Sequence, residues 1–243
     1  MVTYALRVSV IIPTRNEAMS IGRVLADIPR PPVTEVVLVD NDSSDGTREI
    51  AARYGAKVIV EARRGYGRAC LTGLQHVSDP DIVVFLDGDY SDRPAELPLL
   101  LEPIANGRAA IVIGSRLAGP RDRGALPAHS VLGNRFAARL IRLLYGVRLT
   151  DLGPFRAATA AVLRDLALRE AGYGWAVEMI LRGALNRVSI TEVPVSYHRR
   201  IGKSKITGTW RGSIGAAWYI FGRIVQYRWQ YRMQRKPAGA ATL

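Results

Sequence analysis

Two aspartates one residue apart, Asp87 and Asp89, come directly after the apolar run Ile82–Leu86. Two like charges at so short a spacing repel each other unless a cation offsets them. Carboxylate oxygens are ligands that Mg²⁺ and Mn²⁺ prefer, usually together with oxygens of a phosphorylated substrate. A pair with the same spacing, Asp79 and Asp81, precedes the apolar run and is typical of a solvated turn. The sequence therefore predicts a site for Mg²⁺ or Mn²⁺ and a diphosphate at Asp87 and Asp89.

The acidic pair belongs to an alternating pattern of short apolar runs and segments of helical length. The runs are rich in β-branched residues, as expected of parallel strands covered on both faces. They are Val8–Ile12, Val36–Val39, Lys57–Val60, Ile82–Leu86 and Ile111–Ile113. Between them, apolar residues recur at helical spacing, as in residues 21–28 and 97–104. This alternation predicts an α/β fold with a mostly parallel, doubly wound sheet flanked by helices, whose ligands bind beyond the carboxyl ends of the strands.

Charge is distributed unevenly along the 243 residues. Residues 1–116 contain 13 Lys and Arg against 15 Asp and Glu, whereas residues 117–243 contain 21 against 6. A basic half of this kind indicates an anionic partner, which is nucleic acid, a membrane surface or a phosphorylated substrate. The single cysteine excludes an intramolecular disulfide. Neither a signal peptide nor an apolar run of about 18 residues is present, so we expect a cytoplasmic location without a membrane span.

Seven segments in a fixed order carry a family resemblance. They are VSVIIPTRNE, VLVDNDSSDGT, RRGYGRACLTG, VVFLDGDYSDRPAEL, VIGSR, TDLGPFR and VPVSYHRRIGKSKI. Together they resemble the family 2 glycosyltransferases of GT-A fold, and most closely the dolichyl-phosphate mannose synthase and polyprenyl-phosphate glycosyltransferase branch. The resemblance covers roughly residues 8–210. It implies a Rossmann-like GT-A domain over residues 1–209. The pattern of apolar and basic residues at 210–243 predicts an amphipathic, basic C-terminal helix and tail.

The resemblance implies a nucleotide-sugar site at the ends of the first, second and fourth strands. The residues that it assigns to nucleotide binding are Pro13, Arg15, Asn16, Glu17, Asp40, Asp42, Arg64 and Asp87. Asp87 and Asp89 match the metal-binding pair of the family, and Asp89 is expected to be catalytic. The sequence departs from the family pattern at Asn41, where a second acid is usual, at Asp42, where glycine is common, and at Ser91, where glutamine is frequent. These departures leave the identity of the base open.

Positive charge is expected where the leaving diphosphate and the acceptor meet. In the resembling branch, the arginine of GSR and an arginine in the following loop hold the acceptor phosphate. The later loop RRIGKSK resembles a flexible lid over the diphosphate or the acceptor. The candidates in this sequence are Arg116 with Arg121, Arg123 or Arg135, and Arg200 with Lys203 or Lys205.

The chemistry of the acceptor decides whether a base is required. A hydroxyl acceptor needs a group to take its proton, and Asp151 of TDLGPFR, with Glu178 as a second acid, is the candidate. A lipid phosphate is already an anion and needs no base. We expect an inverting, metal-dependent transfer from a nucleotide-diphosphate sugar to a polyprenyl phosphate. One alternative is a soluble or polysaccharide hydroxyl acceptor. Another is a basic nucleic-acid-binding protein, although the basic half lacks the stacking aromatic patterns of RNA modules.

Two amphipathic segments indicate an anionic membrane surface as a partner. Residues 132–147 place arginines on one helical face and apolar residues on another, and an apolar stripe from Trp210 to Trp229 is surrounded by basic residues. We expect peripheral binding at the inner face of the membrane, and a small membrane protein subunit is a further candidate partner. The alternative is that both stripes pack on the protein's own core. Truncation after Gly208 is expected to reduce membrane association and to spare nucleotide binding.

Overall fold

A seven-stranded sheet crosses the part of the chain that the computed structural model describes, residues 6–202 and 219–230. Its strands are β1 (Val8–Thr14), β2 (Val33–Asp40), β3 (Lys57–Val60), β4 (Ile82–Phe85), β5 (Ile111–Ser115), β6 (Arg156–Thr159) and β7 (Ile190–Pro194). Their order is β3-β2-β1-β4-β6-β5-β7, and only β6 runs antiparallel to its neighbours. The sheet is therefore mostly parallel, as the sequence predicts, and all five predicted strands are confirmed.

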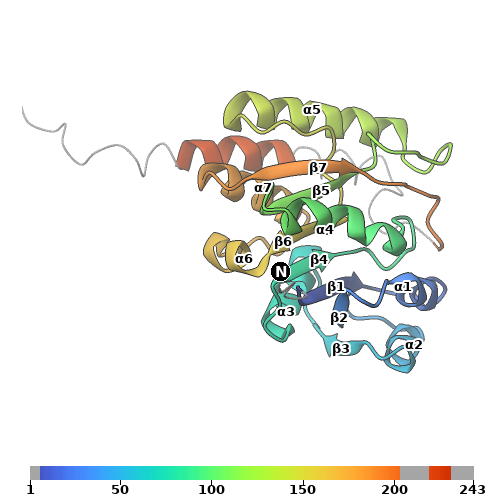
Figure 1. Cartoon of the computed structure of the whole chain (residues 1–243). Coiled ribbons are helices and arrows are strands. Elements are labelled where there is room, and N and C mark those ends of the chain that lie inside the picture. The colour runs from blue at the N-terminus through green and yellow to red at the C-terminus, as the bar shows by residue number, and fades with distance from the viewer. Residues whose placement is uncertain (1–5, 203–218, 231–243) are drawn as a thin grey trace, which may run out of the picture.

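Helices cover both faces of this sheet (Figure 1). One face is covered by α1 (Ile21–Asp27), α2 (Thr47–Arg53) and α4 (Leu97–Ala105), which follows the short 3₁₀ helix η1 (Pro94–Glu96). The other is covered by α3 (Tyr66–His76), α5 (Ala128–Tyr145), α6 (Ala160–Leu166), α7 (Trp175–Leu185) and the helical residues 219–230. Strand residues alternate between the two cores. Val10 and Ile12 of β1 face one core while Ile11 faces the other, which explains why the strands read as continuous apolar runs.

The order of the strands creates a switch point between β1 and β4. The chain winds from β1 outward through β2 to β3, then returns to place β4 on the other side of β1. The helices that join β1 to β2 and β3 to β4, α1 and α3, consequently lie on opposite faces, and a crevice is expected beyond the carboxyl ends of β1 and β4. Pro13 and Thr14 end β1 and are followed by Arg15 and Glu17, and the residues that follow β4 include Asp87 and Asp89. The fold thus brings two of the predicted polar clusters to one place.

The C-terminal helical residues 219–230 pack on the core beside α5 and α7 (Figure 1). Ile224 is fully buried, and its carbonyl accepts a hydrogen bond of 2.6 Å from the hydroxyl of Tyr145. Phe221 packs edge-on against Phe136 of α5, with ring centroids 4.9 Å apart. By contrast, Val225 and Trp229 are mostly exposed. The predicted stripe is therefore divided between the core and the surface in this region, and its earlier part, with Lys203 and Lys205, lies outside the described residues.

No helix within residues 6–202 and 219–230 combines the length and apolar character that crossing a bilayer requires.

Candidate active site

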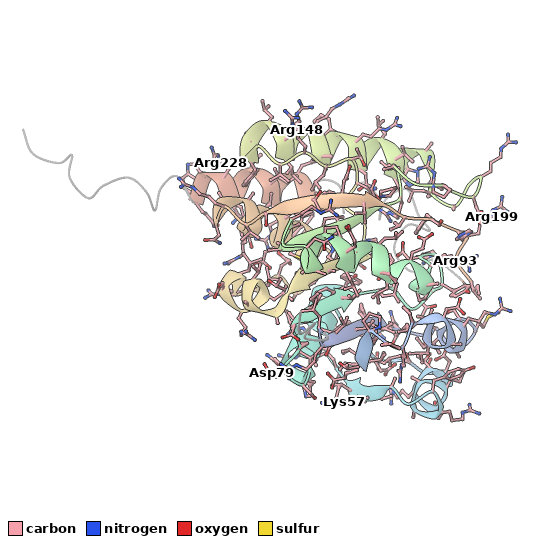
Figure 2. The ribbon with its side chains drawn as sticks, in the orientation of Figure 1. Lys57, Asp79, Arg93, Arg148, Arg199 and Arg228 are labelled. Carbon is pink, nitrogen blue, oxygen red and sulfur yellow. The ribbon has the colours of Figure 1, made fainter. Side chains whose placement is uncertain are left out.

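A pocket of about 270 Å³ lies at the switch point between β1 and β4. Seven of the residues singled out in the sequence line it: Pro13, Arg15, Glu17, Arg64, Asp87, Asp89 and Arg200. Figure 2 shows Asp79, of the acidic pair that precedes β4, at the opposite end of the strands from Arg199, which directly precedes the pocket residue Arg200. Position relative to the strand therefore separates the two acidic pairs, as expected.

The acidic pair is held by contacts from three different segments. The carboxylate of Asp89 accepts hydrogen bonds from the backbone N–H and the hydroxyl of Ser91, at 2.9 and 2.6 Å, and forms an ion pair with Arg200. Asp87 accepts a hydrogen bond of 3.2 Å from the hydroxyl of Tyr66 at the start of α3. Burial and then the neighbouring charge of Asp89 raise the pKa of Asp87 to about 7. Two carboxylates that disfavour each other's charge in this way are suited to sharing a cation.

The donor set of the pocket fits a divalent cation that also binds phosphate. Asp87 and Asp89 provide hard oxygen ligands of the kind that Mg²⁺ and Mn²⁺ bind. Residues 6–202 and 219–230 contain no group of three or more His, Cys, Asp or Glu side chains arranged to hold a metal. A cation at the pair would therefore complete its coordination with oxygens of the substrate and water, which is the usual arrangement for Mg²⁺ bound to a diphosphate.

Asn41 holds the loop that forms another side of the pocket. Its amide nitrogen donates to the carbonyls of Glu61 and Arg63, both at 2.9 Å, and its amide oxygen accepts from the N–H of Gly65 at 2.8 Å. An aspartate at this position has no donor for the two carbonyls. This contact set gives a structural reason for the departure from the family pattern at Asn41, because an amide fixes the loop that carries Arg64 in a way that a carboxylate cannot.

The substitution Asn41→Asp is expected to weaken this loop. It removes two donated hydrogen bonds and places a carboxylate against two carbonyl oxygens, which costs about 1–3 kcal/mol of folding free energy. Chemical denaturation measures the loss. Asn186→Asp is the control, because Asn186 donates only one exposed hydrogen bond, to the carbonyl of Arg182. Equal stabilities of the two variants would show that the side-chain hydrogen bonds of Asn41 contribute nothing to the free energy of folding.

Three further residues assigned to nucleotide binding do not themselves line the pocket. Asp40 is buried, binds Arg48 through an Nε–Oδ2 contact of 2.6 Å, and keeps its Oδ1 without a hydrogen-bond partner. Asp42 pairs with Arg64 at 2.9 Å and so orients a side chain that does line the pocket. The amide oxygen of Asn16 accepts from the N–H of Ser44 and joins the loops after β1 and β2. All three contact or support the lining, and their roles in nucleotide binding stay predictions.

Arg116 and Asp151 form a buried bidentate ion pair that lines neither this pocket nor the one described below. Nε and Nη2 of Arg116 donate to the two oxygens of Asp151 at 2.7 and 2.9 Å, and the N–H of Leu152 adds a bond of 2.8 Å. Burial by itself raises the pKa of Asp151, but the charge and hydrogen bonds of Arg116 outweigh it and hold the pKa below its usual value. This geometry disfavours Asp151 as a general base, because both oxygens are already engaged.

Glu178, the second acid considered as a base, is buried and holds neighbouring segments together. It is buried in α7, and its carboxylate accepts hydrogen bonds from the backbone N–H groups of Arg169 and Glu170, at 2.9 and 2.7 Å. Arg182 and Tyr227 bind the other oxygen. With four donors around it and no contact with the pocket, Glu178 has no oxygen available to an acceptor hydroxyl.

A second, larger cavity of about 770 Å³ lies at the loop before α5. Arg121, Arg123 and Arg135 line it together with apolar Leu126, Val131 and Leu132. The segment after β7 links this cavity to the first pocket. Arg199 donates from Nε and Nη2 to the carbonyl of Arg123, at 3.2 and 2.8 Å, while the next residue, Arg200, lines the first pocket. All three candidate loop arginines thus line one cavity, whereas the side chain of Arg116 does not line it, although its carbonyl accepts a hydrogen bond of 3.1 Å from Arg121. Their roles in acceptor binding stay predictions.

Tyr66 and Tyr173 line the first pocket and were not singled out in the sequence. Tyr66 follows Gly65 in RRGYG, and Tyr173 lies between glycines in AGYGW. A tyrosine flanked by glycines at the start of a helix is the sequence pattern that could have identified both residues, because small neighbours leave the tyrosine ring room to reach a ligand. Neither tyrosine follows a strand, so a search at strand ends passes over both.

Comparison with known proteins agrees with this geometry. The profile of Glycosyl transferase family 2 matches residues 9–172. A dolichyl-phosphate hexose transferase of Haloferax volcanii is 35% identical over 203 residues, which are 82% of this chain and 86% of that protein. An undecaprenyl-phosphate mannosyltransferase of Micrococcus luteus is 32% identical over 229 residues, which are 87% of this chain and 91% of that protein.

A solved structure shares the fold. Glucosyl-3-phosphoglycerate synthase from Mycobacterium tuberculosis, in complex with Mn²⁺, uridine diphosphate and glucosyl-3-phosphoglycerate, has a TM-score of 0.74 with this chain at 23% identity. The match covers 91% of this chain and 80% of that one. The sheet order, the acidic pair at the switch point and the family profile lead to one conclusion. The chain has the GT-A fold and belongs to glycosyltransferase family 2, in the branch that includes the polyprenyl-phosphate glycosyltransferases.

Proposed function

We propose that this glycosyltransferase moves a sugar from a nucleotide-diphosphate sugar to a polyprenyl phosphate with inversion at the anomeric carbon, and that it requires Mg²⁺ or Mn²⁺. One observation carries the proposal. Asp87 and Asp89 meet the residues after β1 and the cationic Arg200 in a single pocket at the β1/β4 switch point. A nucleoside diphosphate needs cationic groups and metal ligands in this combination. The Mn²⁺ and uridine diphosphate in the solved structure of the same fold support this assignment.

The proposed reaction is a single displacement. An oxygen of the acceptor phosphate forms a bond to the anomeric carbon as the bond from that carbon to the diphosphate oxygen breaks. Negative charge grows on the departing nucleoside diphosphate, and a bound divalent cation supplies positive charge that offsets it. Arg15 and Arg200 add fixed positive charge from two other sides of the pocket. The acceptor phosphate enters as an anion, so no side chain has to remove a proton from it.

Two observations favour a lipid phosphate as acceptor. The second cavity combines three arginines and one acid, Asp122, with apolar side chains, and this lining of net positive charge suits a ligand with an anionic head and a hydrocarbon tail. Asp151, the candidate base for a hydroxyl acceptor, has both oxygens occupied by Arg116 and Leu152. Two relatives act, by their names, on dolichyl phosphate and undecaprenyl phosphate. A hydroxyl acceptor is the second candidate, since the solved structure of the same fold holds glucosyl-3-phosphoglycerate.

A transfer assay tests the proposal. Purified protein is incubated with Mn²⁺ or Mg²⁺, a polyprenyl phosphate in detergent and a panel of radiolabelled nucleotide sugars. The proposal expects label in the organic phase with one donor, and loss of that label when EDTA removes the metal. Transfer to soluble sugars or phosphoglycerate, with none to the lipid phosphate, would replace the lipid acceptor by the hydroxyl acceptor. Binding of RNA without any sugar transfer would overturn the enzymatic proposal.

The outer face of α5 supports peripheral binding to an anionic membrane. Its exposed apolar side chains are Leu132, Phe136 and Leu143, exposed by 70, 55 and 81%. They alternate with exposed arginines, which are Arg135, Arg139 and Arg142. Such a face enters the headgroup region with its apolar side chains while the arginines contact lipid phosphates, each basic residue adding about 1 kcal/mol. Figure 1 shows α5 on the outside of the molecule, next to the helical residues 219–230.

Replacing an apolar residue of this face by an acid is expected to weaken binding to lipid vesicles. Leu143→Asp removes apolar contact worth about 1.5–3 kcal/mol and adds a charge that anionic lipid repels, so the affinity falls at least about tenfold. Sedimentation with phosphatidylglycerol vesicles measures it. Leu99→Asp is the control, because Leu99 is 47% exposed on α4, across the sheet from α5. Equal sedimentation of the two variants would exclude α5 as the membrane contact.

A further inference from the structure

Two buried carboxylates fix the segment of residues 169–174 between α6 and α7. Glu178 accepts hydrogen bonds from the N–H groups of Arg169 and Glu170, as described above. Glu170 in turn accepts a bond of 3.2 Å from the N–H of Gly172, and only 8% of its side chain is exposed. The backbone of this segment is therefore held by glutamate side chains and not by a regular helix or strand.

The C-terminal helical residues 219–230 supply further partners of both glutamates, in addition to the contact of Glu178 with Arg182 of α7. Tyr219 donates its hydroxyl to one oxygen of Glu170 at 2.7 Å, and Arg223 forms an ion pair with the other at 2.9 Å. Tyr227 donates its hydroxyl to Glu178 at 2.7 Å. The three residues are four apart, so they lie along one face of the helix. This face of the helix therefore binds the two glutamates through polar contacts of defined direction, and the ring of Tyr219 also lies beside Gly174.

The same segment forms part of the wall of the first pocket. The carbonyls of Ala171 and Gly172 accept hydrogen bonds from Arg68 and Gly67, at 2.9 and 3.1 Å, and these are N–H groups of the first turn of α3. The approach is close. A Cβ added at Gly67 would lie 2.2 Å from the carbonyl oxygen of Glu170, so only glycine fits there.

The contacts continue to the acidic pair. The first turn of α3 carries Tyr66, whose hydroxyl binds Asp87, and the segment itself presents Tyr173 to the pocket. Hydrogen bonds therefore connect Tyr219 and Tyr227 to the two glutamates, the glutamates to residues 169–174, and this segment to the first turn of α3. That turn and the segment carry Tyr66 and Tyr173, which line the proposed diphosphate site.

We propose that residues 219–230 brace the donor pocket, with Tyr219, Arg223 and Tyr227 acting as positioning residues for Tyr66 and Tyr173. The inference rests on the proposed function, because it takes this pocket to be the nucleotide-sugar site. It changes the expectation for a truncation after Gly208. Removal of the helix takes three polar partners from the two glutamates, so nucleotide binding is expected to weaken together with membrane association.

Tyrosine to phenylalanine substitutions in the full-length protein test the brace. Tyr219→Phe combined with Tyr227→Phe keeps both rings and removes only the two hydroxyls. We expect the dissociation constant for uridine or guanosine diphosphate with Mn²⁺, measured by calorimetry, to rise about fivefold to tenfold. The KM for the donor sugar should rise by a similar factor while the KM for the acceptor stays the same. Tyr219→Phe alone should give a smaller rise in the same direction.

Tyr145→Phe is the matched control. It also removes one tyrosine hydrogen bond to the C-terminal helix, but the hydroxyl of Tyr145 binds the carbonyl of Ile224 and neither of the two glutamates. It should lower the melting temperature slightly and leave nucleotide affinity unchanged. Unchanged nucleotide affinity in the double variant, or an equal loss in Tyr145→Phe, would overturn the brace. If the wild-type protein binds no nucleoside diphosphate with Mn²⁺, the proposed function itself fails.

Discussion

Asp89→Asn should reduce glycosyl transfer at least about 100-fold, the scale seen when one preorganised electrostatic contact to a developing charge is removed. Asp89 is buried, lies in the first pocket and shares it with Asp87. An asparagine has nearly the same shape and keeps an oxygen to accept the hydrogen bonds from Ser91, so the loop is expected to stay in place. What it loses is the negative charge that would bind the cation and that pairs with Arg200.

The other D-x-D pair around β4 provides a matched control for Asp89→Asn. Asp79→Asn alters the D-x-D pair that precedes β4, where Asp79 forms an exposed ion pair with Arg7 at 3.1 Å. Loss of such a pair costs at most about 1 kcal/mol of stability and should leave transfer unchanged. Initial rates with donor and polyprenyl phosphate, together with melting temperatures, compare the two variants. Full activity of the Asp89→Asn protein would remove the reason for assigning the pair to the diphosphate.

Arg116→Met should destabilise the protein by about 3–5 kcal/mol at pH 7, because it leaves Asp151 as a buried charge without a counter-ion. The side chain of Asp151 is fully buried, and the bidentate contacts of Arg116 offset its desolvation. Arg108→Met is the control, since Arg108 pairs with Glu102 on the surface and its loss should cost at most about 1 kcal/mol. Denaturant unfolding measures both, and a cost below about 1 kcal/mol for Arg116→Met would contradict the account.

The pH dependence of this effect has a definite sign. In the wild-type protein the pKa of Asp151 is lowered, so its stabilising contribution is present above the pKa of the unfolded chain and is lost as the pH falls through the folded value. Without Arg116, burial raises the folded pKa above the unfolded one. The neutral acid is then favoured in the folded state, so the variant's deficit should shrink as the pH is lowered from 7 toward 5. A double variant, Arg116→Met with Asp151→Leu, should recover most of the stability.

The sequence predicts the fold well where its strands are buried on both faces. Val8–Thr14 and Ile82–Phe85 are apolar and β-branched, and each is followed by polar residues, so both the strand and its functional end can be predicted. Arg156–Thr159 was not predicted because it contains two alanines and a buried arginine in four residues. Its place in the sheet comes from antiparallel pairing with β4 and β5, which local sequence does not encode.

The residues of the candidate site also divide into those that local sequence predicts and those that depend on tertiary contacts. The acidic pair and the residues after β1 could be placed because each directly follows a strand. The pairing of Arg116 with Asp151, 35 residues apart, could not, because it depends on how the loop after β5 meets the loop before β6. In the sequence, Asn41 stands where the family usually has a second acid. Only its three hydrogen bonds in the structure show that it fixes the loop beside it. The sequence motifs identified the residues that line the pocket better than those that orient the lining.

A crystal structure of the protein with Mn²⁺ and a nucleoside diphosphate would show whether Asp87 and Asp89 bind the metal of a metal–diphosphate complex, because the anomalous signal of manganese locates the ion without assumptions about the ligand. We expect a single strong peak between Asp87 and Asp89 and the diphosphate, with metal–oxygen distances of about 2.1 Å. A nucleotide bound elsewhere, or a manganese ion that neither carboxylate contacts, would contradict this expectation.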